Sequence, residues 1–335
     1  KYIDRTYDDE TKQVVEEEKI CTGYMSLTKD ICKRSAGLTS GWYVLDSNIT
    51  HNKLQSIRIK DGADVHLILK DGCTLTATKK DAIQVYNGSM LTIYDQSGGS
   101  GKIVVDGQSG HAGIGVDSNS ILSIKGGVIK SEGTQGGAGI GGNRGDDAGT
   151  TEIYGGDVTS NGGEYGAGIG GGGRSGGSAG ACGDITIYGG TGNATGGKNA
   201  AGIGSGGDPN TGTDDQGSIE IKGGNVTAQG GNKSSGGTIL IGGGDIKAYG
   251  GSCGAGIGGG NKAVAGSIVI NDGNIYAKGG DKAPGIGGDE SGQIKINGGN
   301  ITAIPGKGNE YGIGDEKVDI EIAEGVEVNG VIKEG

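Results

Sequence analysis

Tyrosine recurs at positions of the sequence where a row of aromatic rings could bind a ligand. Tyr94, Tyr154 and Tyr188 each follow the second residue of an alternating apolar pair, which predicts that their side chains point away from the core. Tyr249 and Tyr276 belong to a different predicted strand. Aromatic rings can stack on the faces of sugars, and tyrosine adds a hydroxyl donor. We therefore predict that these tyrosines bind a ligand, and the alternative is an exposed cross-strand ladder that only stabilises the sheet.

Acidic pairs lie between two predicted strands of several repeats, where they could bind a metal ion. Calcium takes about six to eight oxygen ligands, so oxygen-rich loops suit it. The sequence lacks a calcium-repeat consensus, and solvated loop charge is the favoured interpretation. Apart from this calcium, no cofactor is predicted. The candidate ligands are Asp146, Asp147, Asp214, Asp215, Asp289 and Glu290, with a further pair at Asp315 and Glu316.

Residue types that serve in catalysis are scattered along the chain. The histidines are His51, His66 and His111, and no combination of nucleophile, base and orienting group can be assembled from them. A lyase would need a lysine or arginine base beside a calcium–carboxylate cluster. We therefore predict no catalytic residues and no enzymatic activity.

The composition favours a thin, regular core. The chain has 335 residues, of which 81 are glycine, 3 are proline, none is phenylalanine and one is tryptophan. Collagen is excluded because the sequence has no strict three-residue period. Disorder is the main rival, since hydrophobic residues make up only 32% of the chain. Isoleucine and valine nevertheless alternate with other residues in short bursts, which indicates strands.

The charge and the hydrophobicity of the chain exclude two classes of partner, nucleic acids and the membrane interior. The net charge is −11, and no basic patch with interleaved aromatic residues occurs, so we expect no nucleic-acid partner. No apolar run approaches the roughly 20 residues of a membrane span, so we expect no membrane insertion.

The cysteines can form at most two disulfide bonds. A disulfide between Cys21 and Cys32 is the most plausible bridge, with reduced core thiols as the alternative. The other cysteines are Cys73, Cys182 and Cys253.

A repeated marker string is the main guide to the fold. Ala-Gly-Ile-Gly occurs at residues 112–115, 138–141, 167–170, 201–204 and 255–258, with variants at 284–287 and 311–314. The marker isoleucines are 26 to 34 residues apart, except for one spacing of 54 that indicates a repeat without its marker. Such a period is typical of solenoids and related repeat folds.

A second string follows each marker, and a third closes most of the repeats. The second string is a pair of apolar residues separated by one position, such as Ile185 and Ile187, and the third resembles Val226-Thr-Ala228. Three short strands per repeat predict an all-β, right-handed parallel β-helix of roughly ten coils. With coils about 4.8 Å apart, the rod would be on the order of 50 Å long. We expect an N-terminal cap at residues 1–40 and the β-helix at residues 41–335.

The glycines of the marker have two interpretations. If alanine and isoleucine face the core, the glycines between them point outward on successive coils, for example at Gly139, Gly141, Gly168 and Gly170. Such a bare face would let a partner approach the backbone closely. Alternatively, these glycines adopt special backbone angles at tight corners, or they only reflect duplication of the repeat.

The strings resemble a known family of proteins. Gly41-Trp42-Tyr43-Val44, Val65-His66-Leu67-Ile68-Leu69, Asp71-Gly72-Cys73-Thr74-Leu75 and the Ala-Gly-Ile-Gly markers are similar to glycine-rich β-helix surface proteins of clostridia and gut Firmicutes. These are described as carbohydrate-binding-domain or adhesin-like proteins, and their fold is similar to that of pectate lyases. The resemblance covers roughly residues 40 to 325. It implies export to the cell surface, with sugar or host-protein binding.

Three classes of function remain open. The leading hypothesis is a non-enzymatic, adhesin-like binding module of a secreted or cell-surface protein, whose partner is a polysaccharide or a host surface protein. The second is a polysaccharide lyase or hydrolase on the same fold. The third is a structural spacer that holds another domain away from the cell. A flat uncharged face would favour binding or spacing, whereas a cleft lined by carboxylates and a basic residue would favour an enzyme.

Overall fold

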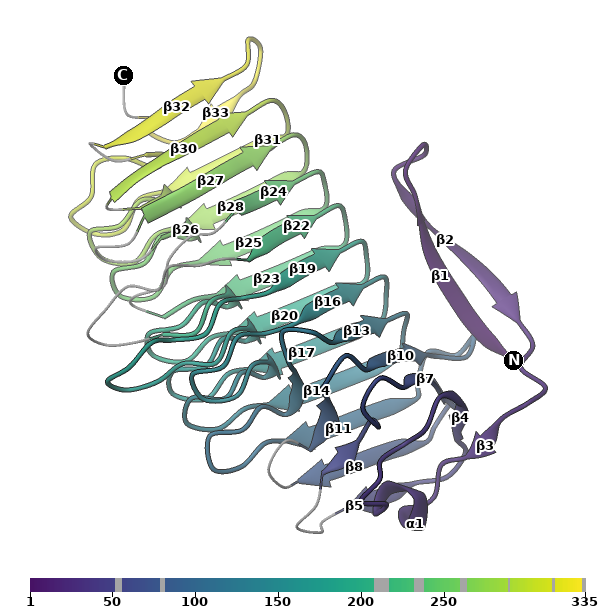
Figure 1. The fold of residues 1–335 in the computed structure, drawn as a ribbon. Coiled ribbons are helices and arrows are strands. Elements are labelled where there is room, and N and C mark those ends of the chain that lie inside the picture. The colour runs from purple at the N-terminus through teal and green to yellow at the C-terminus, as the bar shows by residue number, and fades with distance from the viewer. Residues whose placement is uncertain are drawn as a thin grey trace.

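The chain folds into a parallel β-solenoid of about nine turns, close to the roughly ten expected. This computed structural model describes residues 1–51, 56–78, 82–207, 217–231, 238–259, 264–288, 290–314 and 317–332. The rod begins at the short helix α1 (Lys29–Cys32) and ends at β32 and β33, at its opposite end (Figure 1). No helix in these ranges is long and apolar enough to cross a membrane.

Three parallel sheets form the walls, and each turn contributes a strand to each of them wherever the repeat is complete. Sheet I, which carries the paired apolar residues, consists of β3 (Met25–Ser26), β4 (Gly41–Leu45), β7 (Asp64–Leu69), β10 (Met90–Tyr94), β13 (Ile121–Ile124), β16 (Thr150–Ile153), β19 (Asp184–Ile187), β22 (Ser218–Ile221), β24 (Thr238–Ile241), β27 (Val264–Ile270), β30 (Glu290–Ile296) and β32 (Val318–Ile322).

Sheet II holds the next strand of each turn. Its members are β5 (Ile49–His51), β8 (Thr74–Thr78), β11 (Lys102–Asp106), β14 (Val128–Glu132), β17 (Asp157–Asn161), β20 (Thr191–Thr195), β23 (Asn225–Gln229), β25 (Asp245–Tyr249), β28 (Asn274–Lys278), β31 (Asn300–Ile304) and β33 (Val328–Asn329).

Sheet III contains the short marker strands. They are β6 (Ile57–Arg58), β9 (Ile83–Val85), β12 (Ile114–Val116), β15 (Ile140–Gly141), β18 (Ile169–Gly170) and β21 (Ile203–Gly204), followed after a break by the pair β26 (Ile257–Gly258) and β29 (Ile286–Gly287). The predicted parallel β-solenoid with three strands per turn is thus confirmed.

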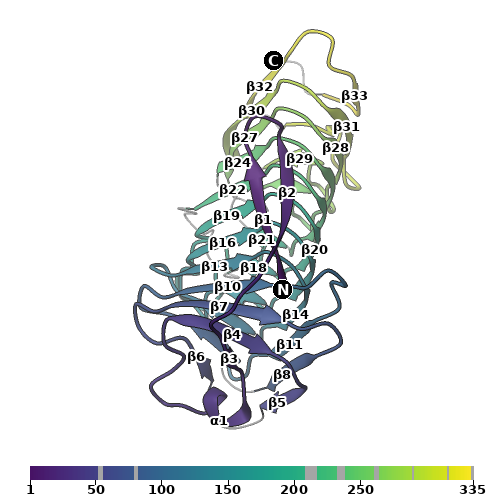
Figure 2. The same ribbon diagram turned by 90° about the vertical axis from the view of Figure 1, so that its right-hand side faces the viewer.

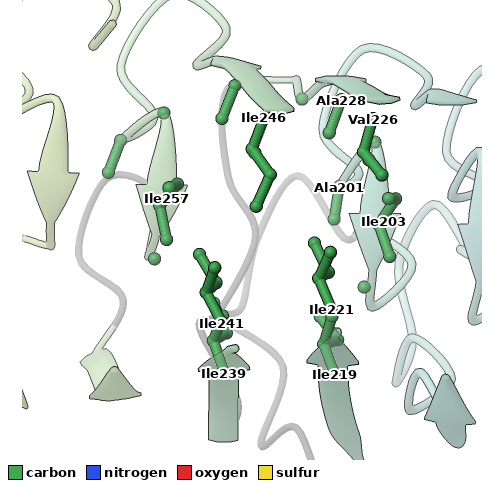
Figure 3. A pocket seen from close by; sticks show the side chains of 17 residues that line it. Ala201, Ile203, Ile219, Ile221, Val226, Ala228, Ile239, Ile241, Ile246 and Ile257 are labelled. Carbon is green, nitrogen blue, oxygen red and sulfur yellow. The ribbon is translucent and has the colours of Figure 1, made fainter. Parts of the chain in front are cut away.

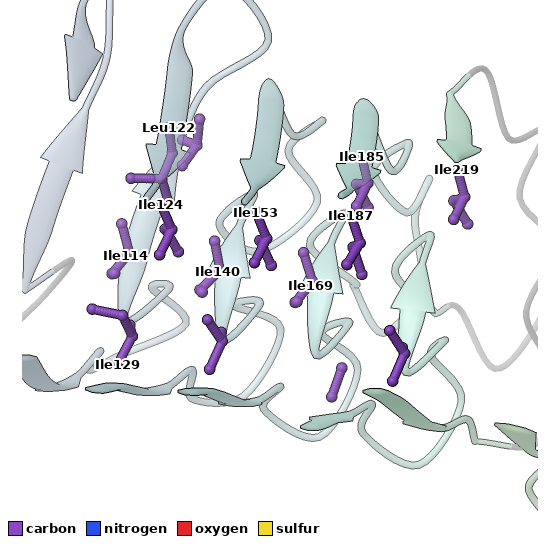
Figure 4. Packing of buried hydrophobic residues seen from close by; sticks show 14 of the residues in the cluster. Ile114, Leu122, Ile124, Ile129, Ile140, Ile153, Ile169, Ile185, Ile187 and Ile219 are labelled. Atoms are coloured by element: carbon purple, nitrogen blue, oxygen red, sulfur yellow. The ribbon is translucent and has the colours of Figure 1, made fainter. Parts of the chain in front are cut away.

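The core is a stack of equivalent aliphatic residues from successive turns. In sheet I, Ile187 pairs with Ile153 on one side and with Ile221 on the other. All three are no more than 5% exposed. Figure 4 shows Ile153 and Ile187 pointing into the same interior space from neighbouring turns. Burial of each such side chain is worth about 1.5–3 kcal/mol, so the stack is the main source of stability.

The marker glycines are enclosed by neighbouring turns, so the interpretation of an outward-facing bare glycine face is wrong at these turns. Gly139, Gly141, Gly168 and Gly170 are all buried. Gly170 has φ +131°, and a β-carbon there would collide with the carbonyl oxygen of Gly204 in the next turn. A residue with a side chain cannot replace glycine at such a position without strain. The backbone-angle interpretation is therefore confirmed for Gly141 and Gly170. Gly139 and Gly168 have no positive φ, and there glycine is needed because a β-carbon would collide with Ser160 and with the Gly202 carbonyl oxygen, respectively.

The described interior contains a cavity near the repeat that lacks its marker string. In the described part of the chain sheet III has no strand between β21 and β26, at the place where the spacing of 54 indicated a repeat without its marker. Between them lies a cavity of about 70 Å³, into which Ile219, Ile239 and Ile257 point (Figure 3). Its lining consists of alanine, glycine, valine and isoleucine alone, so among the described residues no side chain offers a ligand a charge or a hydrogen bond.

Residues 1–40, the predicted cap, divide into two segments that lie in different places. Leu27, Cys32 and Leu38 are buried against the first turn, and Thr28 caps α1 by accepting a hydrogen bond from the Ile31 N–H at 3.3 Å. The preceding residues form an antiparallel hairpin of β1 (Tyr2–Asp8) and β2 (Gln13–Lys19). This hairpin runs along the outer side of sheet I rather than over the end of the rod (Figure 2).

The cysteines are all free thiols, so the proposed bridge between Cys21 and Cys32 is wrong. Cys32 packs in the solenoid core, whereas Cys21 packs against the aromatic cluster beneath the hairpin. Burial raises the pKa of the Cys32 thiol to about 11, which keeps it protonated near neutral pH. Reduced thiols, the alternative interpretation, are confirmed.

Two glycine-to-alanine substitutions should have opposite effects on stability. Gly170→Ala forces a side chain into a left-handed corner against Gly204 and should cost about 2 kcal/mol or more. Gly192 is buried between Val158 and Val226 in sheet II, and a β-carbon there meets nothing within 4 Å. Gly192→Ala should therefore raise stability by about 0.4–1 kcal/mol. Urea denaturation of the two variants tests this, and equal effects would contradict the corner assignment.

Candidate functional site

A wide, open groove lies on the outer side of sheet II. It has a volume of about 950 Å³ and is lined by the ends of β23, β25, β28 and β31 and by the loops that follow them. Gln229, Tyr249 and Lys278 occupy equivalent positions on successive strands, so their side chains lie side by side along its floor. Pockets of roughly 300–1,000 Å³ are typical of small-molecule sites.

The strand pattern explains why these side chains face the groove. Ile246 and Ala248 point into the core and are 3% exposed, so Lys247 and Tyr249 must point out. The loops after the strands contain glycine and pass close to one another. A β-carbon on Gly280 would collide with the Gly251 carbonyl oxygen, so backbone forms much of the groove wall.

The groove combines one aromatic ring, that of Tyr249, with polar and charged groups. The Tyr276 ring lies beside the groove and outside its lining, 5.8 Å from the Tyr249 ring and tilted by 51° to it. Lys278, Asp281 and Lys307 are exposed along the lining. A half-buried ring supplies a flat apolar face for a sugar, and the polar groups around it can bind hydroxyls or a charged substituent. The structure thus brings Tyr249 and Tyr276 together, as the prediction requires.

The other predicted tyrosines lie on sheet I, and the hairpin covers them. Tyr94 is only 7% exposed, because the Tyr2 ring lies 4.8 Å from it and Trp42 5.2 Å. Burial also raises the pKa of its phenol. With the hairpin docked, Tyr94 offers no free ring face to a ligand.

Tyr154 and Tyr188 form a stacked pair farther along the same face. Their rings are 4.3 Å apart and almost parallel, at 14°. The Lys125 ammonium sits 3.3 Å from the centre of the Tyr154 ring, and the Tyr7 ring of the hairpin lies 5.1 Å from that of Tyr188. Burial raises the pKa of the Tyr154 phenol, so it remains neutral. In this structure the pair is part of an internal interface.

An ion pair fixes the hairpin to the solenoid. The Arg5 guanidinium donates to the Asp95 carboxylate at 2.7 Å and to the Lys125 carbonyl at 2.6 Å. The Arg5 side chain is 14% exposed and that of Asp95 is 3% exposed. Burial opposes the charged form of Arg5, but the hydrogen bonds to Asp95 and Glu16 outweigh it and raise the pKa of the guanidinium. Sequence reasoning missed this contact because 90 residues separate the partners.

The predicted calcium ligands are described only in part. Asp146 and Asp147 lie with Asp117 in a shallow groove of about 460 Å³. One oxygen of Asp147 accepts a hydrogen bond from the Ala181 N–H at 2.8 Å, and Asp117 accepts one from the Asn87 N–H at 2.7 Å. Among the residues that the structure describes, no group of three or more histidine, cysteine or acidic side chains could hold a metal ion.

The remaining acidic pairs cannot be placed. The residues Asp214, Asp215, Asp289, Asp315 and Glu316, together with the side chain of Glu290, lie outside the described part of the chain.

The histidines occupy separate parts of the fold. His66 stacks on Trp42 at 4.4 Å and 17°, on the outer side of sheet I. His51 is buried in β5 of sheet II, and His111 lies in the loop before β12. The structure therefore does not bring the three together.

Loss of the arginine anchor should release the hairpin. Arg5→Ala leaves the Asp95 carboxylate buried without its cationic partner, which typically costs about 3–5 kcal/mol. Trp42 is the only tryptophan and lies 4.9 Å from Tyr2, so acrylamide quenching of its fluorescence should increase. Lys1→Ala removes an exposed pair with Glu18, with side chains 62% and 45% exposed, and should change nothing measurable. Unchanged quenching in Arg5→Ala would contradict the anchor.

The repeat in this chain matches a known family of repeats. A family model described as a beta helix repeat matches residues 122–145, 152–173, 219–238, 268–291 and 294–315. The first of these stretches runs from β13 through β14 to β15 and so covers about one turn of the solenoid. No curated protein and no solved structure gives a significant match. The repeat match and the stacked parallel strands together make this chain a parallel β-helix protein.

Proposed function

We propose that the protein is a non-enzymatic binding module, secreted or displayed on a cell surface, that contacts a glycan through the groove over β25 and β28. The observation that carries the proposal is the groove itself, in which Tyr249 lies between Gln229 and Lys278. A sugar ring would stack on the tyrosine face, while the amide and the ammonium group would bind its hydroxyls or an acidic substituent.

The solenoid makes this site rigid. Tyr249 is held by a strand whose inward residues are buried on both sides by neighbouring turns, and the loops beside it pack through their backbones. A preformed surface loses little conformational entropy when it binds. The groove is also open along the rod, which suits a chain-like polysaccharide better than a small compact ligand.

Two alternatives make different demands on the surface. A lyase or hydrolase needs an acid and a base in reach of one bond, whereas the groove offers two lysines and a single carboxylate at Asp281. A spacer needs no groove at all. A host surface protein remains the other candidate partner for the same face.

Truncation of the groove tyrosine should weaken glycan binding. The unaltered protein is first screened on a glycan array, and the best oligosaccharide is then titrated by calorimetry. Tyr249→Ala should weaken its affinity about tenfold or more, equivalent to about 1.4 kcal/mol. Tyr24→Ala is the matched control, because Tyr24 is 53% exposed beside β3, at the other end of the rod.

Three outcomes would contradict the proposal. Equal affinity in the Tyr249→Ala variant would show that the glycan binds elsewhere. Absence of binding to every glycan would favour a spacer or a host-protein partner. Release of shortened products from a polysaccharide would establish an enzyme.

A further inference from the structure

The N-terminal hairpin has the properties of a separate arm. Its two strands pair with each other over seven residue pairs, from Tyr2 with Lys19 to Asp8 with Gln13. The one backbone hydrogen bond between the hairpin and the solenoid in the described structure runs from the Ile3 N–H to the Asp95 carbonyl, at 2.9 Å. In each of the other hydrogen bonds between the described residues of the two, at least one partner is a side chain, as where the Lys125 ammonium group donates to the Arg5 carbonyl at 2.6 Å. An isolated two-stranded hairpin is at best marginally stable in water, so this arm depends on the surface beneath it.

The surface of sheet I that the hairpin contacts extends over several turns of the solenoid. Tyr2 packs on Trp42 and Tyr94 near the base, and Tyr7 packs on Tyr188 near the tip. Beyond Tyr7, the Asp9 carboxylate lies 3.5 Å from the Lys222 ammonium group, but its side chain is 76% exposed. The hairpin is therefore anchored by the buried Arg5–Asp95 pair, whereas the ion pair at its tip is exposed and contributes little to docking.

Apolar side chains are exposed where the arm joins the rod. Residues 20–24 connect β2 to β3 without regular structure. In and beside this connection, Ile20 is 70% exposed, Tyr24 53% and Met25 41%. Val15 on β2 adds another exposed apolar side chain, at 47%. Ile20, Tyr24 and Met25 lie within six residues of one another, so their exposed apolar side chains are ones that a partner at this connection would cover.

We propose that the hairpin is exchanged between two copies of this chain, so that the hairpin of each copy docks on sheet I of the other. A second copy is the occupant that fits this surface, because its hairpin reproduces the contacts of Arg5 with Asp95 and of Tyr7 with Tyr188. Only the connection at residues 20–24 has to change conformation. In a symmetric pair the two connections run near each other, which covers Ile20 and Tyr24.

Reversal of the anchoring charges tests the exchange. Arg5→Asp places two acids against each other within one chain, and Asp95→Arg places two arginine groups together, so neither variant can dock its own hairpin. In an equimolar mixture, exchange restores an opposite-charge pair at both interfaces. Light scattering should show that each variant alone is a monomer and that the mixture forms a heterodimer. Acrylamide quenching of Trp42 should be high in each variant alone and fall to that of the unaltered protein in the mixture.

A second pair of variants covers the case in which the buried Asp95→Arg change prevents folding. Tyr7→Cys and Tyr188→Cys, mixed and oxidised, form a disulfide between two chains only if hairpins are exchanged. Each variant oxidised alone controls for the native thiols. A cross-linked dimer that appears only in the mixture supports the proposal. Monomers in both mixtures would overturn it and would establish the hairpin as a strap fixed within one chain, with no bearing on glycan binding at Tyr249.

Discussion

Each turn of this solenoid is too thin to bury its own apolar side chains, and so each depends on the turns above and below it. Ile187 is covered by Ile153 on one side and by Ile221 on the other, and the same holds along the rod. This requirement explains the parallel pairing and the recurrence of isoleucine at one position. It also explains the marker glycines, because a corner such as Gly170 must let the next turn approach within backbone contact.

The register that stacks the core also stacks the outer side chains. Tyr154 meets Tyr188 because the strands that carry them are paired in register. Tyr249 meets Lys278 for the same reason. The two aromatic surfaces nevertheless differ in their surroundings: the one on sheet I is covered by the hairpin, whereas the one on sheet II borders an open groove. The repeat therefore produces rows of outward side chains on both sheets. The hairpin covers the row on sheet I and leaves the row on sheet II exposed.

Local patterns in the sequence were sufficient to predict the strands, the inward isoleucines, the missing marker and the outward direction of Tyr154 and Tyr188. They depend on period-two alternation and on repeat spacing, which are local properties. The hairpin contact could not be predicted, since the Arg5–Asp95 pair joins residues far apart in the sequence. For the same reason Tyr94 was expected to be free, although Tyr2 covers it. The alternation of side chains along a strand could not decide between the two interpretations of the marker glycines, because it does not account for positive φ angles at corners.

Contacts between isoleucine methyl groups test the stacked core most directly. A nuclear Overhauser spectrum of deuterated protein with protonated isoleucine methyl groups reports on neighbouring turns, which lie about 4.8 Å apart. The Ile187 methyl signal, assigned by its loss in Ile187→Val, should show cross-peaks to both Ile153 and Ile221. Cross-peaks to neither residue, or to partners that require antiparallel pairing of the turns, would contradict the stacked parallel arrangement.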